Sequence, residues 1–239
     1  MNIVITGATS GIGRQLALDY HNAGHIVWAV GRSDEELQKL AQQGLKTLQV
    51  DLLNRDETLS CFASLDRIDL AVLAAGSCEY IDLPDFDSAL VARVMRVNVE
   101  TMAHSIEALL PVLRKSSDAH LVGVGSSAAY LPLPRAEAYG ASKAAVAYLI
   151  KTLRTTLAGE GIAVSLVCPG FVKTPLTDLN DFPMPFMVDV KEASETIRKG
   201  IARRKTEIHF PAIFTGSMKL LALLPQALWS RLARRMIKQ

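Results

Sequence analysis

Three residues in the middle of the chain have the types and the spacing of an acid/base site. Tyr139 and Lys143 are four positions apart in a segment of helical period, so their side chains share one face of the expected helix. Ser126 precedes Tyr139 by thirteen residues. A tyrosine with a pKa of about 10 must lose roughly three units to work near neutrality, and an ammonium about 4 Å away supplies that order of energy. The pattern predicts that Tyr139 is a general acid/base assisted by Lys143, although Tyr-x-x-x-Lys alone is also common on solvated helix faces.

A glycine-rich segment near the start of the chain has the order of elements that phosphate binding requires. The β-branched run 2–6 leads into Thr6-Gly-Ala-Thr-Ser-Gly-Ile-Gly13, and a helical pattern begins within that segment. Glycines let the backbone approach a pyrophosphate, and the free N–H groups and dipole of a helix N-terminus favour its charge. The spacing is GxxxGxG rather than GxGxxG, so a tight strand-to-helix turn is the alternative interpretation. We expect a dinucleotide to bind here.

The end of the second expected strand, 25–30, indicates which dinucleotide is bound. A dinucleotide fold places an acidic residue here to hold the adenosine ribose, or a basic residue to hold a 2′-phosphate. The sequence has Gly31 followed by Arg32, whose guanidinium suits phosphate. NADP, as NADPH, is therefore favoured over NAD. A solvated arginine near Asp34 is the alternative.

The elements that must position these residues alternate along the chain. Short β-branched runs alternate with longer segments of helical period, which is typical of βαβ units and a parallel sheet. We therefore predict a single α/β domain over residues 1–239, with a parallel sheet of seven strands. The segment 174–188 contains three prolines and is expected to be an irregular substrate loop. The expected strands are 2–6, 25–30, 45–50, 68–74, 120–124, 162–167 and 207–210, and the expected helices are 11–23, one starting at 34, 98–114 and 136–159.

Composition excludes several other classes of protein. The 239 residues are 49% hydrophobic and 21% charged, which is typical of a globular chain with a large core. The net charge of +2 is too close to balance for a dedicated nucleic-acid binder, and no apolar run approaches the ~18 residues of a membrane span. Cys61, Cys78 and Cys168 are expected to be reduced core residues, and no metal site is expected from the histidines or cysteines. The N-terminus has no signal-peptide pattern, so we expect a cytoplasmic protein.

Taken together, these motifs resemble the short-chain dehydrogenase/reductase family. The resemblance covers residues 2 to about 175, and the family's spacing selects Ser126 rather than Ser127. One departure is Leu73-Ala-Ala-Gly76, where the family usually has Asn-Asn-Ala-Gly, and this puts a hydrogen bond that braces the sheet in doubt. The matching positions are Thr6-Gly7, Gly11-Ile12-Gly13, Asp51-Leu52, Ala74-Ala75-Gly76, Asn98, Ser126, Tyr139-Gly-Ala-Ser-Lys143, Pro169-Gly170 and Thr174.

The resemblance implies a role for each of these positions. Ser126 would orient a carbonyl, Tyr139 would donate the proton, and Lys143 would hold the ribose while lowering the pKa of Tyr139. Asn98 would anchor a water, Asp51 would contact adenine, and Thr174 would contact the nicotinamide amide or the phosphates. The family also implies a single-domain Rossmann fold, in which a doubly wound parallel sheet of about seven strands has helices on both faces, and a homodimer or homotetramer. The expected cofactor-binding residues are Gly7, Thr9, Ser10, Gly11, Ile12, Gly13, Arg32, Asp51, Leu52, Ala75, Gly76, Tyr139, Lys143, Pro169, Gly170, Val172 and Thr174.

The function expected from these residues is an NADPH-dependent oxidoreductase that reversibly reduces a carbonyl to an alcohol. The apolar character of 174–188 and of the C-terminal segment favours an apolar ketone, aldehyde or 3-oxoacyl substrate. Two alternatives remain open. One is a non-catalytic dinucleotide-binding sensor or scaffold, and the other is a reductase that associates with a membrane surface.

The segment 214–239 is both apolar and basic. Pro225 is expected to divide it into two short helices. Its apolar residues are expected to be buried by docking beside 174–188, in the same chain or in a partner chain, and membrane contact is the alternative. The apolar residues are Leu220, Leu221, Leu223, Leu224, Leu228, Trp229, Leu232 and Met236, interleaved with Lys219, Arg231, Arg234, Arg235 and Lys238.

Overall fold

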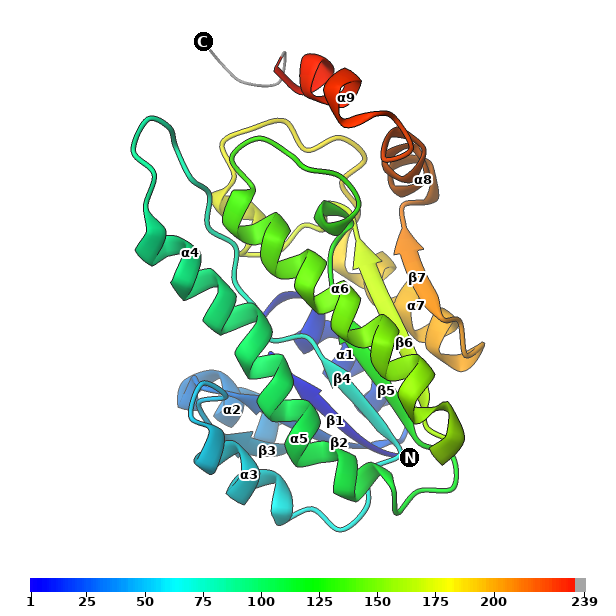
Figure 1. Ribbon diagram of the computed structural model, residues 1–239. Helices are drawn as coiled ribbons and strands as arrows, with labels where there is room; N and C mark the ends of the chain where they lie inside the picture. The colour runs from blue at the N-terminus through cyan, green and yellow to red at the C-terminus, as the bar shows by residue number, and fades with distance from the viewer. Residues whose placement is uncertain (235–239) are drawn as a thin grey trace.

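The computed structural model describes residues 1–234, apart from the side chain of Leu179, and this part of the chain contains a seven-stranded sheet (Figure 1). Neighbouring strands all run parallel, in the order β3-β2-β1-β4-β5-β6-β7. The expected doubly wound parallel sheet is therefore confirmed. The strands are β1 (Asn2–Thr6), β2 (Ile26–Gly31), β3 (Lys46–Gln49), β4 (Leu70–Leu73), β5 (His120–Val124), β6 (Ala163–Pro169) and β7 (Glu207–Phe210).

Helices cover both faces of the sheet, and the alternation of side chains along each strand supplies one core to each face. In β1, Ile3 and Ile5 pack towards one face and Val4 packs towards the other. Every residue of β4 and β5 is buried, as expected for central strands. The first face is covered by α1 (Gly11–Asn22), α2 (Asp34–Ala41) and α7 (Val190–Ala202), and the second by α3 (Arg55–Ala63), α5 (Thr101–Leu113) and α6 (Glu137–Leu157).

The helical segment expected at 98–114 begins earlier than the sequence indicated. It starts with α4 (Ser88–Met95), continues through one π-helical turn (Arg96–Glu100) and ends as α5. Val94 is the buried residue of α4, so the apolar periodicity of that helix is too weak to be recognised. The sequence analysis also missed α3, whose N-terminus is capped by the side chain of Asn54.

The C-terminal segment forms α8 (Ala212–Leu221) and α9 (Gln226–Ala233), and Pro225 separates them as expected. Both helices lie at the upper end of Figure 1, beyond the carboxyl ends of the strands. The expectation that the apolar residues of this segment are buried is wrong for Leu220, Leu223, Leu228 and Leu232, which are exposed. Met236, Arg235 and Lys238 lie outside the described residues.

None of the helices described between residues 1 and 234 is both long enough and apolar enough to cross a bilayer.

Candidate active site

The parallel sheet gathers the sequence-predicted residues at one edge. The glycine turn follows β1, Gly76 follows β4, Ser126 follows β5 and Thr174 follows β6. The carboxyl ends of parallel strands meet at the same edge of the sheet, where open α/β folds bind their ligands. Figure 1 shows this edge below α8, α9 and the loop that precedes α7.

The turn after β1 lies directly against the turn after β4. Gly7 has a φ of +67°, and a Cβ on it would come within 2.8 Å of the backbone nitrogen of Ala75, so this position requires glycine. The hydroxyl of Thr6 accepts hydrogen bonds from the backbone N–H groups of Ala74 at 3.1 Å and Ala75 at 3.3 Å. Thr6 therefore braces the turn in which the family's asparagines are missing.

The N-terminus of α1 is shaped for an anion. A Cβ on Gly13 would lie 2.3 Å from the carbonyl oxygen of Gly7, and one on Gly11 would lie 3.2 Å from Cγ2 of Thr174, so Thr174 lies beside the glycine turn as expected. Ser10 is the N-cap of α1, but its side chain makes no capping hydrogen bond within the described residues. By contrast, α2, α3, α4 and α7 each have a side chain that accepts from a first-turn N–H group. The first-turn N–H groups of α1 are thus free of a side-chain cap, as are those of α5, α6, α8 and α9.

Two arginines lie near the end of β2. A Cβ on Gly31 would be 2.5 Å from Cγ2 of Thr9, so Gly31 lies directly against the glycine turn. Arg32 is the next residue and therefore lies close to that turn. The Arg32 side chain is exposed and forms no salt bridge within residues 1–234, and the Asp34 carboxylate accepts from Gln38 instead. Arg14 Nε is buried without a hydrogen-bond partner among the described residues.

Ser126, Tyr139 and Lys143 come together as the sequence predicted. The Ser126 side chain lies close enough to the Tyr139 hydroxyl to lower the pKa of Tyr139, and Ser126 Oγ accepts from the N–H of Ala128 at 3.1 Å. Lys143 lies one turn further along α6, with its Nζ 5.7 Å from the centroid of the Tyr139 ring. Lys143 is buried and donates to the carbonyl oxygen of Val124 at 3.4 Å.

Burial governs the proton affinities of this cluster. It raises the pKa of Tyr139 above its ordinary range, and the neighbouring Ser126 side chain only partly opposes that rise. Burial also lowers the pKa of Lys143 to about 8, since the charged ammonium is desolvated. The expected lowering of the Tyr139 pKa is therefore not what the structure shows. At neutral pH the Tyr139 hydroxyl is protonated, which is the state of a proton donor.

Asn98 holds the turn after β4 against α6. It is fully buried in the π-helical turn, a local geometry often found at functional sites. Its Oδ1 accepts from the N–H of Ser77 at 2.8 Å, and its Nδ2 donates to the Ser77 carbonyl at 3.0 Å and to Ser142 Oγ at 2.8 Å. A Cβ on Gly76 would lie 2.7 Å from Asn98 Oδ1 and 3.3 Å from Lys143 Nζ. Gly76 thus leaves room beside both side chains.

The remaining predicted cofactor residues lie at the same strand ends. Asp51 follows β3, is exposed, and accepts from the N–H of Leu53 at 3.1 Å. Leu52 beside it is buried. Gly170 donates to the Phe210 carbonyl at 2.7 Å directly after β6, which ends at Pro169.

A parallel bridge between Val172 and Val188 closes the base of the substrate loop 174–188. Above that bridge, aromatic rings form a continuous row. The Phe171 and Phe182 ring centroids are 6.1 Å apart, Phe171 and Phe214 are 5.5 Å apart, and Phe214 and Phe186 are 6.2 Å apart. The row joins the substrate loop to α8.

Three residues that the sequence did not indicate, namely Cys78, Tyr80 and Arg135, form a wall of the site together with Phe182 of the predicted substrate loop. Tyr80 meets Phe182 edge to face at 5.2 Å, and the Arg135 guanidinium lies 5.7 Å from the Tyr80 ring centroid. Cys78 is half-buried and belongs to none of the hydrophobic core clusters of the described residues, and burial raises the pKa of its thiol. The expectation that Cys78 is a core residue is therefore wrong. These residues lie in loops without a motif, so no spacing signal could have identified them.

The C-terminal helices share one buried cluster with Leu131, and each makes a further contact of its own. Phe214 brings α8 beside the substrate loop through its contact with Phe186, in line with the expected docking. In contrast, α9 docks on the segment before α6, where Trp229 Nε1 donates to the carbonyl of Pro132 at 2.7 Å. A groove of about 710 Å³ separates α9 from the outward side of α6.

Comparison with known proteins identifies the family. The family model for short chain dehydrogenases matches residues 1–181. An uncharacterized oxidoreductase of Myxococcus xanthus is 35% identical, over 98% of this chain and 96% of that protein. A short chain dehydrogenase from Burkholderia cenocepacia, solved in complex with NADP, has a TM-score of 0.86 at 25% identity and covers 97% of this chain and 96% of its own. The closed form of a serine dehydrogenase complexed with NADP⁺ has a TM-score of 0.81 at 25% identity, with 88% and 94% covered.

The chain therefore belongs to the short-chain dehydrogenase family. The prediction that it is an oxidoreductase of this family, with a Rossmann fold, is confirmed.

Proposed function

We propose that this protein is an NADPH-dependent carbonyl reductase that also works in the reverse direction as an alcohol dehydrogenase. The observation that carries the proposal is the placement of Ser126 beside Tyr139, with the Lys143 Nζ 5.7 Å from the Tyr139 ring centroid at the carboxyl edge of the sheet. This arrangement presents one protonated hydroxyl to a carbonyl oxygen and a second hydroxyl to orient it.

The residues at the carboxyl edge fit NADP. Gly7 and Gly13 let the glycine turn pack closely against neighbouring backbone, Gly11 has no side chain to press on Thr174, and the N-terminus of α1, which lacks a side-chain cap, offers N–H groups to a pyrophosphate. Arg32 is exposed without an acidic partner among residues 1–234, and Arg14 has a buried Nε that lacks an acceptor there. These two guanidinium groups would hold a 2′-phosphate. The solved relatives with bound NADP or NADP⁺ support the same cofactor.

When bound, NADPH supplies a hydride to the carbonyl carbon. The carbonyl oxygen takes hydrogen bonds from Tyr139 and Ser126 and receives the Tyr139 proton as negative charge develops on it. The products are the alcohol and NADP⁺. Because burial keeps the pKa of Tyr139 high, the phenol holds its proton until the substrate accepts it.

Lys143 and Asn98 position the site. The Lys143 ammonium lies beside Gly76, where it would donate to the cofactor ribose. Asn98 fixes the Gly76–Ser77 turn against Ser142 of α6, and thereby sets the space between the turn and Lys143. The proposal also includes the role that the family resemblance implies for Asn98, which is to anchor a water.

The aromatic row from Tyr80 to Phe186 supports an apolar ketone, aldehyde or 3-oxoacyl substrate. We further propose a cytoplasmic location and a homodimeric or homotetrameric assembly. The test of the function is consumption of NADPH with a panel of ketones, aldehydes and 3-oxoacyl thioesters. Turnover that Tyr139→Phe abolishes supports the reductase. Tight NADPH binding without turnover on any member of the panel would instead support a sensor or scaffold.

A further inference from the structure

The two C-terminal helices expose an apolar face. Ile213 and Leu220 are seven positions apart and share one side of α8, and Leu228 and Leu232 are four positions apart on one side of α9. Leu223 lies between the helices. These five side chains, which we call the outer apolar face, are between 38 and 79% exposed.

The opposite sides of the same helices are already occupied. Met218 of α8 and Trp229 and Ala233 of α9 are buried in one cluster with Leu131. Trp229 is also anchored through its hydrogen bond to Pro132. Each helix therefore has apolar residues on two sides: one side is buried against the protein and the other is exposed. The core of this chain does not account for the outer apolar face.

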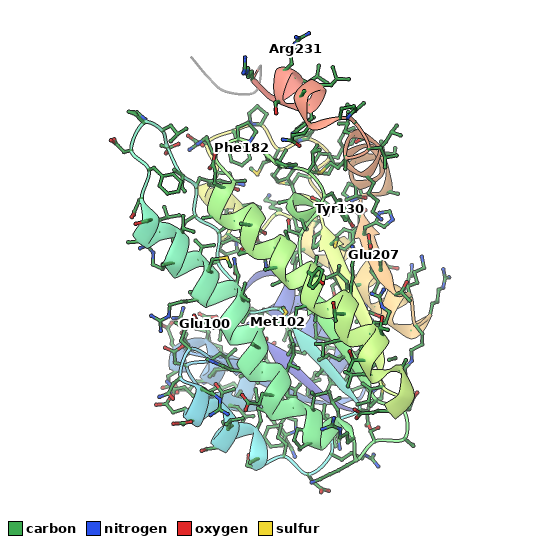
Figure 2. The ribbon with its side chains drawn as sticks, viewed as in Figure 1. Glu100, Met102, Tyr130, Phe182, Glu207 and Arg231 are labelled. Atoms are coloured by element: carbon green, nitrogen blue, oxygen red, sulfur yellow. The ribbon has the colours of Figure 1, made fainter. Side chains whose placement is uncertain are left out.

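Positive charge accompanies these leucines. Residues 211–239 contain five Lys or Arg residues and no Asp or Glu. Arg231 and Arg234 are exposed and form no salt bridge within the described residues, whereas Lys219 is paired with Glu207 at 2.6 Å. Figure 2 shows Arg231 at the extreme end of the molecule, beyond Phe182 of the substrate loop.

Another exposed apolar segment near the carboxyl edge has the opposite charge. Residues 79–87 expose Leu83 and Phe86, but they contain four carboxylates and no Lys or Arg. Exposed leucines therefore occur on α8 and α9, the unpaired cations Arg231 and Arg234 occur in α9 and at its C-terminus, and the neighbouring segment 79–87 has no such cations. An anionic partner would therefore bind at the basic segment 211–239 and not at the acidic segment 79–87.

We propose that the outer apolar face binds the surface of a bilayer that contains anionic phospholipids. Helices with leucines and cations on one exposed side lie in the boundary between headgroups and acyl chains, and each cation near an anionic surface adds to the attraction. Arg231 and Arg234 would contact the lipid phosphates while the leucines enter the boundary. A second copy of the same face is a poorer partner, since a twofold contact would bring the arginines of both copies together.

The docked orientation would bring the reacting end of the protein to the lipid. The contact of Phe214 with Phe186 places α8 beside the substrate loop. If the proposed reductase function holds, carbonyl substrates dissolved in the bilayer would be close to the site. The lipid contact itself does not depend on that function.

The test is co-sedimentation of the full chain with vesicles. One set consists of phosphatidylcholine alone, and the other of phosphatidylcholine mixed with phosphatidylglycerol. We expect binding to the mixed vesicles at low salt, at least tenfold weaker binding to neutral vesicles, and progressive release as salt is added.

Two variants and two matched controls make the test specific. Leu223→Glu and Arg231→Glu should each weaken binding to the mixed vesicles at least tenfold with an unchanged melting temperature, because both side chains are exposed. Ile26→Glu changes an exposed apolar residue of β2 and Arg203→Glu changes an exposed cation after α7, and both should bind like the unmodified protein.

Failure of the unmodified protein to bind mixed vesicles would overturn the proposal. So would equal binding by Leu223→Glu, or equal loss with the two controls. A dimer that Leu223→Glu dissociates, without vesicle binding, would assign the face to a second copy instead. Sedimentation needs no turnover, so none of these results bears on the reductase function, and an inactive protein that binds vesicles would leave the lipid contact intact.

Discussion

Arg135 donates from Nη1 to Asp181 of the substrate loop at 2.6 Å, and from Nε to Asp82 after β4 at the same distance. One guanidinium thereby ties together two segments that line the site, and it also lies over the Tyr80 ring. The backbone of Arg135 has a φ of +66°, a left-handed value that costs a non-glycine residue free energy. The side-chain contacts offset that cost.

Removing this tie should weaken substrate binding more than catalysis. Exposed ion pairs contribute up to about 1 kcal/mol each, so Arg135→Ala should raise KM for an apolar carbonyl by roughly three- to tenfold with a smaller change in kcat. Steady-state kinetics measure both. Arg135→Gly is the matched control, because it removes the same ion pairs and relieves the left-handed backbone. Arg135→Gly should raise KM as much as Arg135→Ala does, but it should have a higher melting temperature. A fall in kcat alone would show that Arg135 acts in the chemical step.

The Tyr139 hydroxyl is the proposed proton donor. Tyr139→Phe keeps the ring and removes that proton, so turnover should fall by about 10² or more while NADPH affinity changes little. Fluorescence titration of NADPH gives the affinity, and NADPH consumption gives turnover. If the variant retains more than about a tenth of the activity, another group carries the proton. Lys143→Ala should reduce both quantities, since Lys143 would also contact the ribose.

The pH profile should report Lys143 rather than Tyr139. Burial lowers the pKa of Lys143 to about 8, so its ammonium is present below that pH and is lost above it. Burial raises the pKa of Tyr139, so the phenol stays protonated throughout the same range. The kcat/KM for NADPH in the reductive direction should therefore be flat up to about pH 8 and fall above it. In Lys143→Arg the side chain stays charged, so its remaining activity should not fall there. A decline in that variant at the same pH would assign the titration to another group.

The sequence was sufficient for the sheet because each strand is a short apolar run next to a turn. Three of the seven strands, at 2–6, 120–124 and 207–210, have the predicted bounds. Helices with few buried residues have weak apolar periodicity and were harder to predict from the sequence. α3 buries only Thr58 and Phe62, so its tertiary contacts leave little periodicity in the sequence.

The candidate site also contains residues that the sequence predicts and residues that it does not predict. Residues at fixed spacing, such as Tyr139 and Lys143, share a helical face that depends only on local geometry. Tyr80, Arg135 and Phe182 meet through loops far apart in the sequence, and Arg135 reaches its two carboxylates from an unusual backbone conformation. The raised Tyr139 pKa could not be predicted either, because desolvation depends on how the surrounding segments pack.

Cofactor choice should depend on Arg32. NADPH should bind at least tenfold tighter than NADH, a difference of about 1.4 kcal/mol that one charge-assisted contact can supply. Arg32→Ala should remove most of that preference by weakening NADPH alone. Arg14→Met should have a smaller effect in the same direction, since only part of its guanidinium lacks a partner. Asp34→Asn, whose carboxylate accepts from Gln38, is the control and should leave the ratio unchanged. Equal affinities for NADH and NADPH in the unmodified protein would contradict the assignment.

Trp229 anchors α9, and its loss should release that helix from the segment before α6. The indole is buried in a small cluster with Leu131 and Met218, and its Nε1 donates to Pro132. Replacing a buried tryptophan by alanine typically costs about 3 to 5 kcal/mol, which exceeds what the remaining docked residue Ala233 can supply. In Trp229→Ala, amide exchange should therefore accelerate across α9, while the sheet and NADPH affinity stay as they are. Leu228→Ala removes an exposed neighbour and should leave exchange unchanged.

Because α8 rather than α9 contacts the substrate loop, KM for apolar carbonyls should rise less in Trp229→Ala than on deletion of residues 212–239, which also removes Phe214 from Phe186. A larger effect of Trp229→Ala would show that α9 covers the substrate directly.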